Sequence, residues 1–136
     1  QRQMCIRDSY NLATKDARKV LPKELDFKTA THGSAIANAL VASLFTQNYK
    51  MAGELMESDV FHEPYREKLV PELNQIREVA HQKHAVATYL SGAGSTVMTW
   101  IEDEDVRGFL SGLNKHGLKA NTFILHPDEN GVQIIE

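Results

Sequence analysis

The sequence predicts an α+β domain in which a mostly antiparallel sheet carries helices packed on one face. Two runs of β-branched and apolar residues, 85–90 and 96–101, are separated by five small residues that include two glycines, a pattern typical of strand, tight turn and strand. A third such run covers 118–125, and Asn130-Gly131 marks a turn before a short fourth run over 132–135. Apolar residues between these runs recur at helical spacing, which places helices among the strands.

Composition limits the classes of protein to consider. The 136 residues correspond to one domain, and 42% of them are hydrophobic, as in an ordinary globular protein. A formal net charge of −3 gives no basic surface for nucleic acid. One cysteine allows no internal disulfide, and no apolar run approaches the length of a membrane span. We therefore expect a cytoplasmic protein with neither nucleic acid nor membrane as a partner.

Two helices are expected in the first third of the chain. Thr14 is predicted to cap a short helix that Pro22 ends, and Asp26 is predicted to cap a long helix over 27–47. The apolar residues of the long helix follow its period, so we expect them in the core: Ile36, Ala37, Leu40, Val41, Leu44 and Phe45.

Three further helices are expected downstream. The first covers 49–57, with Met51, Leu55 and Met56 turned inward. The second starts at Pro71 and buries Leu73, Ile76, Val79 and Ala80. The third begins in the acidic run 102–105, buries Val106, Phe109, Leu110 and Leu113, and ends at Gly117.

Histidines suggest a metal site only weakly. His62-Glu63 matches the start of the HExxH zinc motif, but Arg66 stands where the second histidine is required. His81 and His84 are three residues apart with no cysteine or carboxylate in the same pattern. We assign no metal ligand.

The segment from Leu90 to Thr96 resembles the third, C-terminal motif of the GHMP kinases, a family of small-molecule kinases. Residues 59–66 with Leu69-Val70-Pro71, and residues 14–22, resemble two segments of the homoserine kinase branch of that family. The resemblance runs from about Tyr10 to the end of the chain and corresponds only to the C-terminal half of such an enzyme. It implies the ferredoxin-like C-terminal domain of the family over residues 10–136.

The resemblance implies ATP-dependent phosphorylation of L-homoserine to O-phospho-L-homoserine, a step of threonine biosynthesis. It makes Thr14, Arg18 and Arg66 substrate-binding residues, since a guanidinium can grip an amino-acid carboxylate with two parallel hydrogen bonds. The glycine turn, formed by Ser91, Gly92, Ala93 and Gly94, would face the active site. No residue of the chain is assigned as catalytic.

The same resemblance assigns ATP and Mg²⁺ mainly to the family's N-terminal domain, which carries the main phosphate loop. We find no such loop here and expect the chain to be inactive without that domain, with a homodimer as a further potential assembly. Ser95 stands where the family usually has proline, which makes the turn less rigid. Two alternatives are another GHMP kinase, for example of the mevalonate type, and a non-catalytic α+β module that binds a small ligand.

Residues 1–9 show no period and no family match. The segment from Cys5 to Ser9 resembles translated sequencing-adapter read-through. We therefore expect residues 1–9 to be non-native or disordered.

Overall fold

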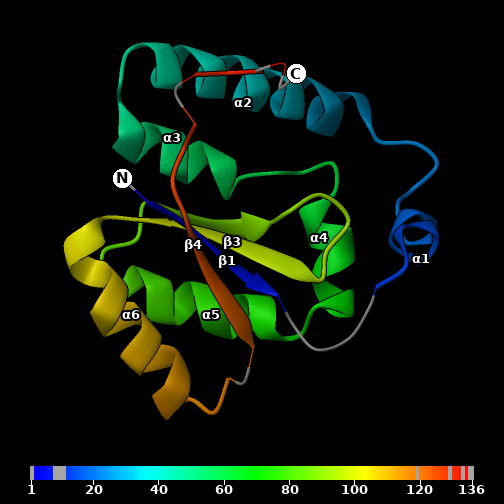
Figure 1. Ribbon diagram of the computed structural model, residues 1–136. Coiled ribbons are helices and arrows are strands. Elements are labelled where there is room, and N and C mark those ends of the chain that lie inside the picture. Colours follow the sequence, from blue (N-terminus) through cyan, green and yellow to red (C-terminus); the bar gives the residue numbers. More distant parts are fainter. Residues whose placement is uncertain (1, 8–11, 119, 129, 133, 135–136) are drawn as a thin grey trace.

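The computed structural model describes residues 12–118, 120–128, 130–132 and 134, together with the backbone of residues 2–7. Its sheet has four strands in the order β2-β3-β1-β4, and all neighbouring strands are antiparallel (Figure 1). The strands are β1 (Arg2–Arg7), β2 (Ala87–Leu90), β3 (Thr96–Ile101) and β4 (Asn121–Leu125). Helices lie between them in the chain, so the α+β class is confirmed.

Strands β2 and β3 form the hairpin predicted around the glycine turn. Their register pairs Leu90 with Val97 and Ala87 with Trp100. β2 forms one edge of the sheet and β4 the other. The strand expected over 132–135 lies partly outside the described residues, and Val132 and Ile134, which are described, belong to no strand.

Strand β1 was not predicted. Its backbone lies between β3 and β4, with Arg2 opposite Ile101 and Gln3 opposite Leu125. The segment therefore takes an internal position in the sheet. Its non-native origin stays a prediction.

Helices α5 (Glu72–His81) and α6 (Asp103–Lys115) cover one face of the sheet (Figure 1). Phe109 and Leu73 are fully buried there against Val97 and Ile101 of β3. The apolar periodicity of both helices predicted these inward faces correctly. The buried core consists of Val70, Leu73, Ile76, Val79, Ala80, Val97, Ile101, Val106, Phe109 and Leu113.

Helix α3 (Tyr49–Met56) packs against β2, and α2 (Phe27–Phe45) packs on α3 (Figure 1). Asp26 caps α2 as predicted, because its carboxylate accepts a hydrogen bond from the Thr29 N–H at 3.0 Å. The Tyr49 ring meets Trp100 of β3 edge-on, with 5.5 Å between ring centroids. Trp100 points to the face opposite Val97, since side chains alternate along a strand.

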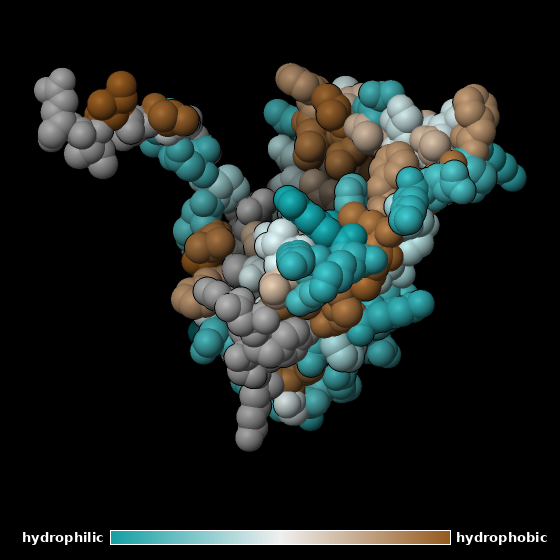
Figure 2. Space-filling model, turned by 90° about the vertical axis from the view of Figure 1, so that its right-hand side faces the viewer, coloured by the Kyte–Doolittle hydropathy of each residue, from teal (hydrophilic) through white to brown (hydrophobic). Residues whose placement is uncertain are grey.

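The prediction that the apolar residues of α2 lie in the core is wrong, because none of the six predicted residues is fully buried. Only Gly33 and Ser43 of this helix are buried, whereas Val41, Leu44 and Phe45 are 54%, 38% and 87% exposed. The reason is that α2 contacts α3 along one side and no other described element covers the rest of its apolar surface. Figure 2 shows hydrophobic residues gathered at the top of the molecule, where Figure 1 places α2.

Two smaller expectations also need correction. The residue that caps α1 (Thr14–Lys19) is Ala13, whose backbone is extended, while Thr14 is the first helical residue and makes no cap hydrogen bond. Met51 is 48% exposed, because α3 buries its small residues Ala52 and Gly53 instead. Among the described residues, no helix is both long and apolar enough to cross a bilayer.

Candidate functional site

The glycine turn lies open at the end of the β2–β3 hairpin. Gly92 and Gly94 have φ angles of 63° and 87°, a region that side chains with a Cβ rarely adopt. A Cβ added to Gly92 would meet nothing within 4 Å, so this side of the turn is accessible. A Cβ on Gly94 would instead lie 3.1 Å from Val70 and 3.2 Å from Leu12, so Gly94 anchors the turn to the domain.

The backbone of the turn offers two adjacent hydrogen-bond donors. The Ser91 N–H donates to the Thr96 carbonyl at 2.8 Å, and the Gly94 N–H donates to Ser91 at 3.4 Å. Within the described part of the chain, nothing accepts a hydrogen bond from the N–H groups of Gly92 and Ala93. Successive free N–H groups in such a turn form a concavity that suits an anion.

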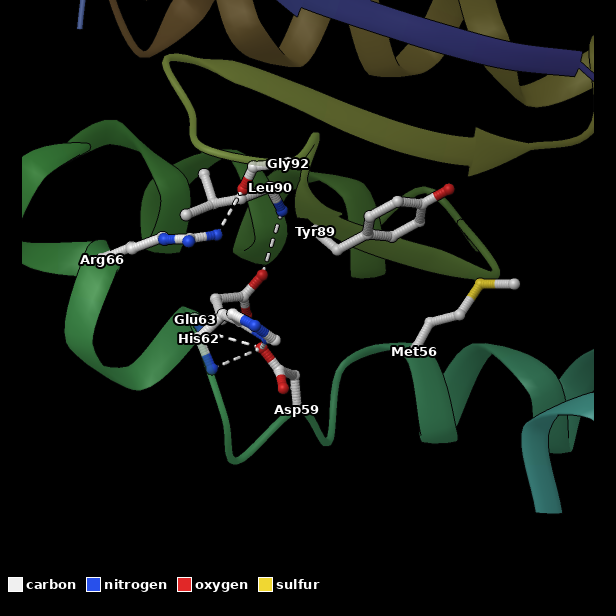
Figure 3. A pocket seen from close by; sticks show the side chains of 8 residues that line it. All are labelled: Met56, Asp59, His62, Glu63, Arg66, Tyr89, Leu90 and Gly92. Atoms are coloured by element: carbon white, nitrogen blue, oxygen red, sulfur yellow. Dashed lines mark hydrogen bonds and ion pairs between the residues drawn. The ribbon is translucent and has the colours of Figure 1, made fainter. Parts of the chain in front are cut away.

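Arg66 joins the turn to two helices. It is the last residue of α4 (Glu63–Arg66), which continues into the 3-10 helix η1 (Glu67–Leu69). Its Nη1 donates to the Gly92 carbonyl at 2.8 Å (Figure 3). Its Nε donates to the Ala17 carbonyl of α1 at 3.2 Å. No described carboxylate forms an ion pair with it. The half-buried guanidinium therefore keeps its charge and part of its donors for a ligand.

Asp59 fixes the start of α4. Its carboxylate accepts hydrogen bonds from the N–H groups of Phe61, His62 and Glu63 at 2.9, 3.0 and 2.8 Å. Burial raises the pKa of Asp59, but these N–H groups and the His62 ring, 3.5 Å away, outweigh burial and leave the pKa below its usual 3.8. Asp59 is therefore ionised at neutral pH and holds the loop before Arg66 in one shape.

These residues surround a small pocket of about 90 Å³ (Figure 3). Arg66 and the turn form one side, and Tyr89 closes another with its half-buried ring. Burial raises the pKa of Tyr89, so its hydroxyl stays protonated. The lining residues are Met56, Asp59, His62, Glu63, Arg66, Tyr89, Leu90 and Gly92.

The structure brings together only some of the residues predicted for the site. Arg66 and Gly92 line the pocket, and Ser91, Ala93 and Gly94 belong to the same turn. Thr14 and Arg18 do not line it. Both are exposed on α1, and the Arg18 side chain has no partner among the described residues. The hydrogen bond from Arg66 to the Ala17 carbonyl links helix α1 to the pocket.

Six pocket residues were not predicted as site residues: Met56, Asp59, His62, Glu63, Tyr89 and Leu90. One signal was available, because Pro64 is typical of the first turn of a helix, and the carboxylate of the nearby Asp59 accepts hydrogen bonds from the N–H groups of His62 and Glu63 at that helix start. Tyr89 had no such signal, since it reads as an ordinary strand residue. No group of three or more potential metal ligands occurs in the described part of the chain.

A family model described as "GHMP kinases C terminal" matches residues 37–118. The homoserine kinase of Lactobacillus acidophilus is 98% identical over 127 residues, which are 93% of this chain and 44% of that protein. The homoserine kinase of Lactobacillus gasseri is 53% identical over 126 residues, again 93% of this chain and 44% of the relative. The chain thus spans less than half the length of these curated relatives.

Solved structures show the same fold. The homoserine kinase of Cytophaga hutchinsonii superposes with a TM-score of 0.80 at 22% identity, over 92% of this chain and 41% of that one. The mevalonate kinase of L. major, in complex with R-mevalonate, gives a TM-score of 0.72 at 15% identity, over 93% of this chain and 43% of that one. At these identities the likeness concerns the fold alone.

Proposed function

Since the chain belongs to the GHMP kinases and matches their C-terminal domain, we propose that it is the C-terminal part of a homoserine kinase. The complete enzyme would transfer the γ-phosphate of ATP to the side-chain hydroxyl of L-homoserine in the cytoplasm. Two relatives with that name, at 98% and 53% identity, support homoserine over other acceptors.

The position of Arg66 carries the proposal. Its guanidinium lies where α1, α4 and the glycine turn meet, half-buried at the pocket and free of any described carboxylate. A planar cation held by two backbone carbonyls is oriented in advance, so it can bind an amino-acid carboxylate without first being ordered. In-line transfer needs the acceptor hydroxyl fixed relative to the γ-phosphate, and a fixed carboxylate contributes to that.

Arg18 and Thr14 take supporting roles in this proposal. Arg18 follows Ala17, whose carbonyl accepts a hydrogen bond from Arg66, and its exposed side chain would supply a second cation to the same substrate. Thr14 lies one helical turn before Arg18 and supplies a hydroxyl on the same helix.

ATP would meet this domain at the glycine turn. The free N–H groups of Gly92 and Ala93 and the open space beside Gly92 fit a phosphate oxygen. Two N–H groups are few for a triphosphate, so we assign most of the binding of ATP and Mg²⁺ to the N-terminal part of the enzyme. When bound, Mg²⁺ would neutralise phosphate charge during the transfer.

The exposed apolar surface of α2 fits the absence of that N-terminal part. Val41, Leu44 and Phe45 form an apolar surface of the kind that a second domain or subunit usually covers. We propose that the N-terminal part covers it in the complete enzyme, and that the chain alone has no kinase activity. A homodimer through the same surface is the alternative arrangement.

The test uses a hybrid enzyme in which the matched 127 residues of this chain replace their counterparts in the Lactobacillus acidophilus homoserine kinase. Arg66→Lys keeps the charge but loses the bidentate geometry, so the KM for homoserine should rise roughly tenfold or more, while the KM for ATP changes less than about twofold. Arg107→Lys, an exposed position on α6, is the matched control and should change neither. A rise confined to the KM for ATP would reject the role of Arg66.

A further inference from the structure

Side chains form hydrogen bonds with the backbone at the outer edge of strand β2, where another strand could otherwise pair. The Thr88 N–H donates to Glu57 Oε1 at 2.6 Å, and the Leu90 N–H donates to Glu63 Oε2 at 3.0 Å. The Thr88 carbonyl between them accepts from Nε and Nη2 of Arg77 at 3.0 and 2.9 Å. Side chains from α4, α5 and the end of α3 thus hold the strand that leads into the glycine turn.

These side chains also bind one another. Arg77 donates through Nη2 to Glu63 Oε1, and its Nε lies 3.7 Å from Glu57. The side chains of Arg77, Glu57 and Glu63 are 19%, 15% and 11% exposed. His81 completes the group, with its Nε2 3.0 Å from Glu57. Both oxygens of Glu63 therefore have a partner, and the pair with Arg77 is largely shielded from water.

Glu63 and Arg66 attach α4 to the strand and the turn at two points. Glu63 bonds Leu90, and Arg66, one helical turn later, bonds Gly92, two residues after Leu90 (Figure 3). Helix α4 has only four residues, too few to be stable by itself. Its orientation, and with it the direction of the Arg66 side chain, must come from such tertiary bonds. Asp59 fixes the backbone at the start of α4, and Glu63 fixes its rotation toward the turn.

We propose that Glu63 and Arg77 are positioning residues for substrate binding, because their ion pair orients α4 so that Arg66 faces the bound amino acid. This inference rests on the proposed function of Arg66. Glu63 and Arg77 do not need to touch the substrate themselves. If the pair only stabilised the fold, its loss would not affect the binding of one substrate more than the other. If the pair positions Arg66, its loss weakens the binding of homoserine and leaves the binding of ATP unchanged.

The experiment measures steady-state kinetics of the hybrid enzyme with each substrate varied. Glu63→Gln keeps the shape of the side chain and an oxygen for the Leu90 N–H, but it removes the charge that Arg77 pairs with. We expect the KM for homoserine to rise roughly tenfold, the scale of a misplaced binding group, with the KM for ATP within about twofold. Glu78→Gln removes the same charge from an exposed position next to Arg77 and should change neither constant.

A double variant separates positioning from direct action. If Glu63 acts through Arg66, adding Glu63→Gln to Arg66→Lys raises the KM for homoserine less than about twofold beyond Arg66→Lys alone. Full additivity of the two effects would overturn the inference, and so would a Glu63→Gln variant with a lower melting temperature and an unchanged KM for homoserine.

Arg77→Lys provides an independent variant in case Glu63→Gln does not fold. Lysine keeps the charge but lacks the planar guanidinium that donates to the Glu63 carboxylate and the Thr88 carbonyl at the same time. We therefore expect the same rise in the KM for homoserine, with the KM for ATP little changed. An unchanged KM in Arg77→Lys contradicts the inference. If Arg66→Lys itself leaves the KM for homoserine unchanged, the proposed function of Arg66 fails. If only Arg66→Lys raises it, Arg66 keeps its role and the positioning inference fails.

Discussion

Gly53 in α3 is the position at which this fold tolerates a side chain least. A Cβ at Gly53 would lie 1.9 Å from the Val86 carbonyl oxygen, and both groups are fixed to the backbone. Helix α3 would have to move away from Val86, the residue before β2, by about 1.5 Å to restore ordinary van der Waals contact. We therefore expect Gly53→Ala to separate α3 from β2.

The size of the effect follows from the contacts at this junction. Forcing the extra methyl group into the packing costs about 1–3 kcal/mol. A shift of α3 also breaks the hydrogen bond from Thr88 N–H to Glu57, which follows directly on α3, at about 1.5–3 kcal/mol for a charged acceptor. Alanine has a better helix propensity than glycine, which offsets about 1 kcal/mol of this loss in the free energy of unfolding. The expected net loss in the free energy of unfolding is about 3 kcal/mol.

Urea unfolding followed by circular dichroism measures this loss, with Gly108→Ala as the control. Gly108 also lies inside a helix, but the nearest atom to its added Cβ is the flexible Lys83 side chain at 3.5 Å. Gly108→Ala should therefore stabilise the chain by up to about 1 kcal/mol. Equal effects of the two substitutions, or a stable Gly53→Ala variant, would refute the packing of α3 on β2.

Three further predictions concern the acid dependence, the open surface and the core. The pKa of Asp59 is lowered in the folded state, so the stabilisation by its carboxylate is present above the unfolded-state pKa of 3.8 and is lost as the pH falls through the folded-state pKa. The difference in melting temperature between the parent and Asp59→Asn should therefore shrink below about pH 4, and a constant difference would contradict this prediction. Phe45→Lys should lower the binding of a hydrophobic dye and leave the melting temperature nearly unchanged, because Phe45 is 87% exposed; unchanged dye binding would count against an open α2 surface. Phe109→Ala should cost about 3–5 kcal/mol in urea unfolding, since Phe109 is fully buried, and a loss below about 1 kcal/mol would place it outside the core.

The elements predicted best are those whose signal is local. The hairpin around Gly92 and the buried faces of α5 and α6 follow from alternation, helical period and turn residues in contiguous sequence. The apolar stripe of α2 follows the same rule, yet most of it is exposed. Periodicity shows that a helix has an apolar face. It does not show which element, if any, covers that face.

The candidate site was predicted only in part, for a related reason. Arg66 and the glycine turn were identified through motif resemblance, which records residue types at fixed spacing. The bonds of Glu63 to Leu90 and to Arg77 join positions 27 and 14 residues apart, and no sequence pattern marks such a pair. Thr14 and Arg18 were grouped with the pocket by resemblance, whereas the structure leaves both exposed beside it.

We expect the guanidinium of Arg66 to bind the carboxylate of L-homoserine in the complete enzyme. The most direct test compares L-homoserine with its amide, in which a neutral group replaces the carboxylate, as substrates of the hybrid enzyme and of its Arg66→Lys variant. We expect Arg66→Lys to lower kcat/KM for L-homoserine by about tenfold or more and to change kcat/KM for the amide by less than about twofold. An equal loss for both substrates would show that Arg66 does not act on the carboxylate.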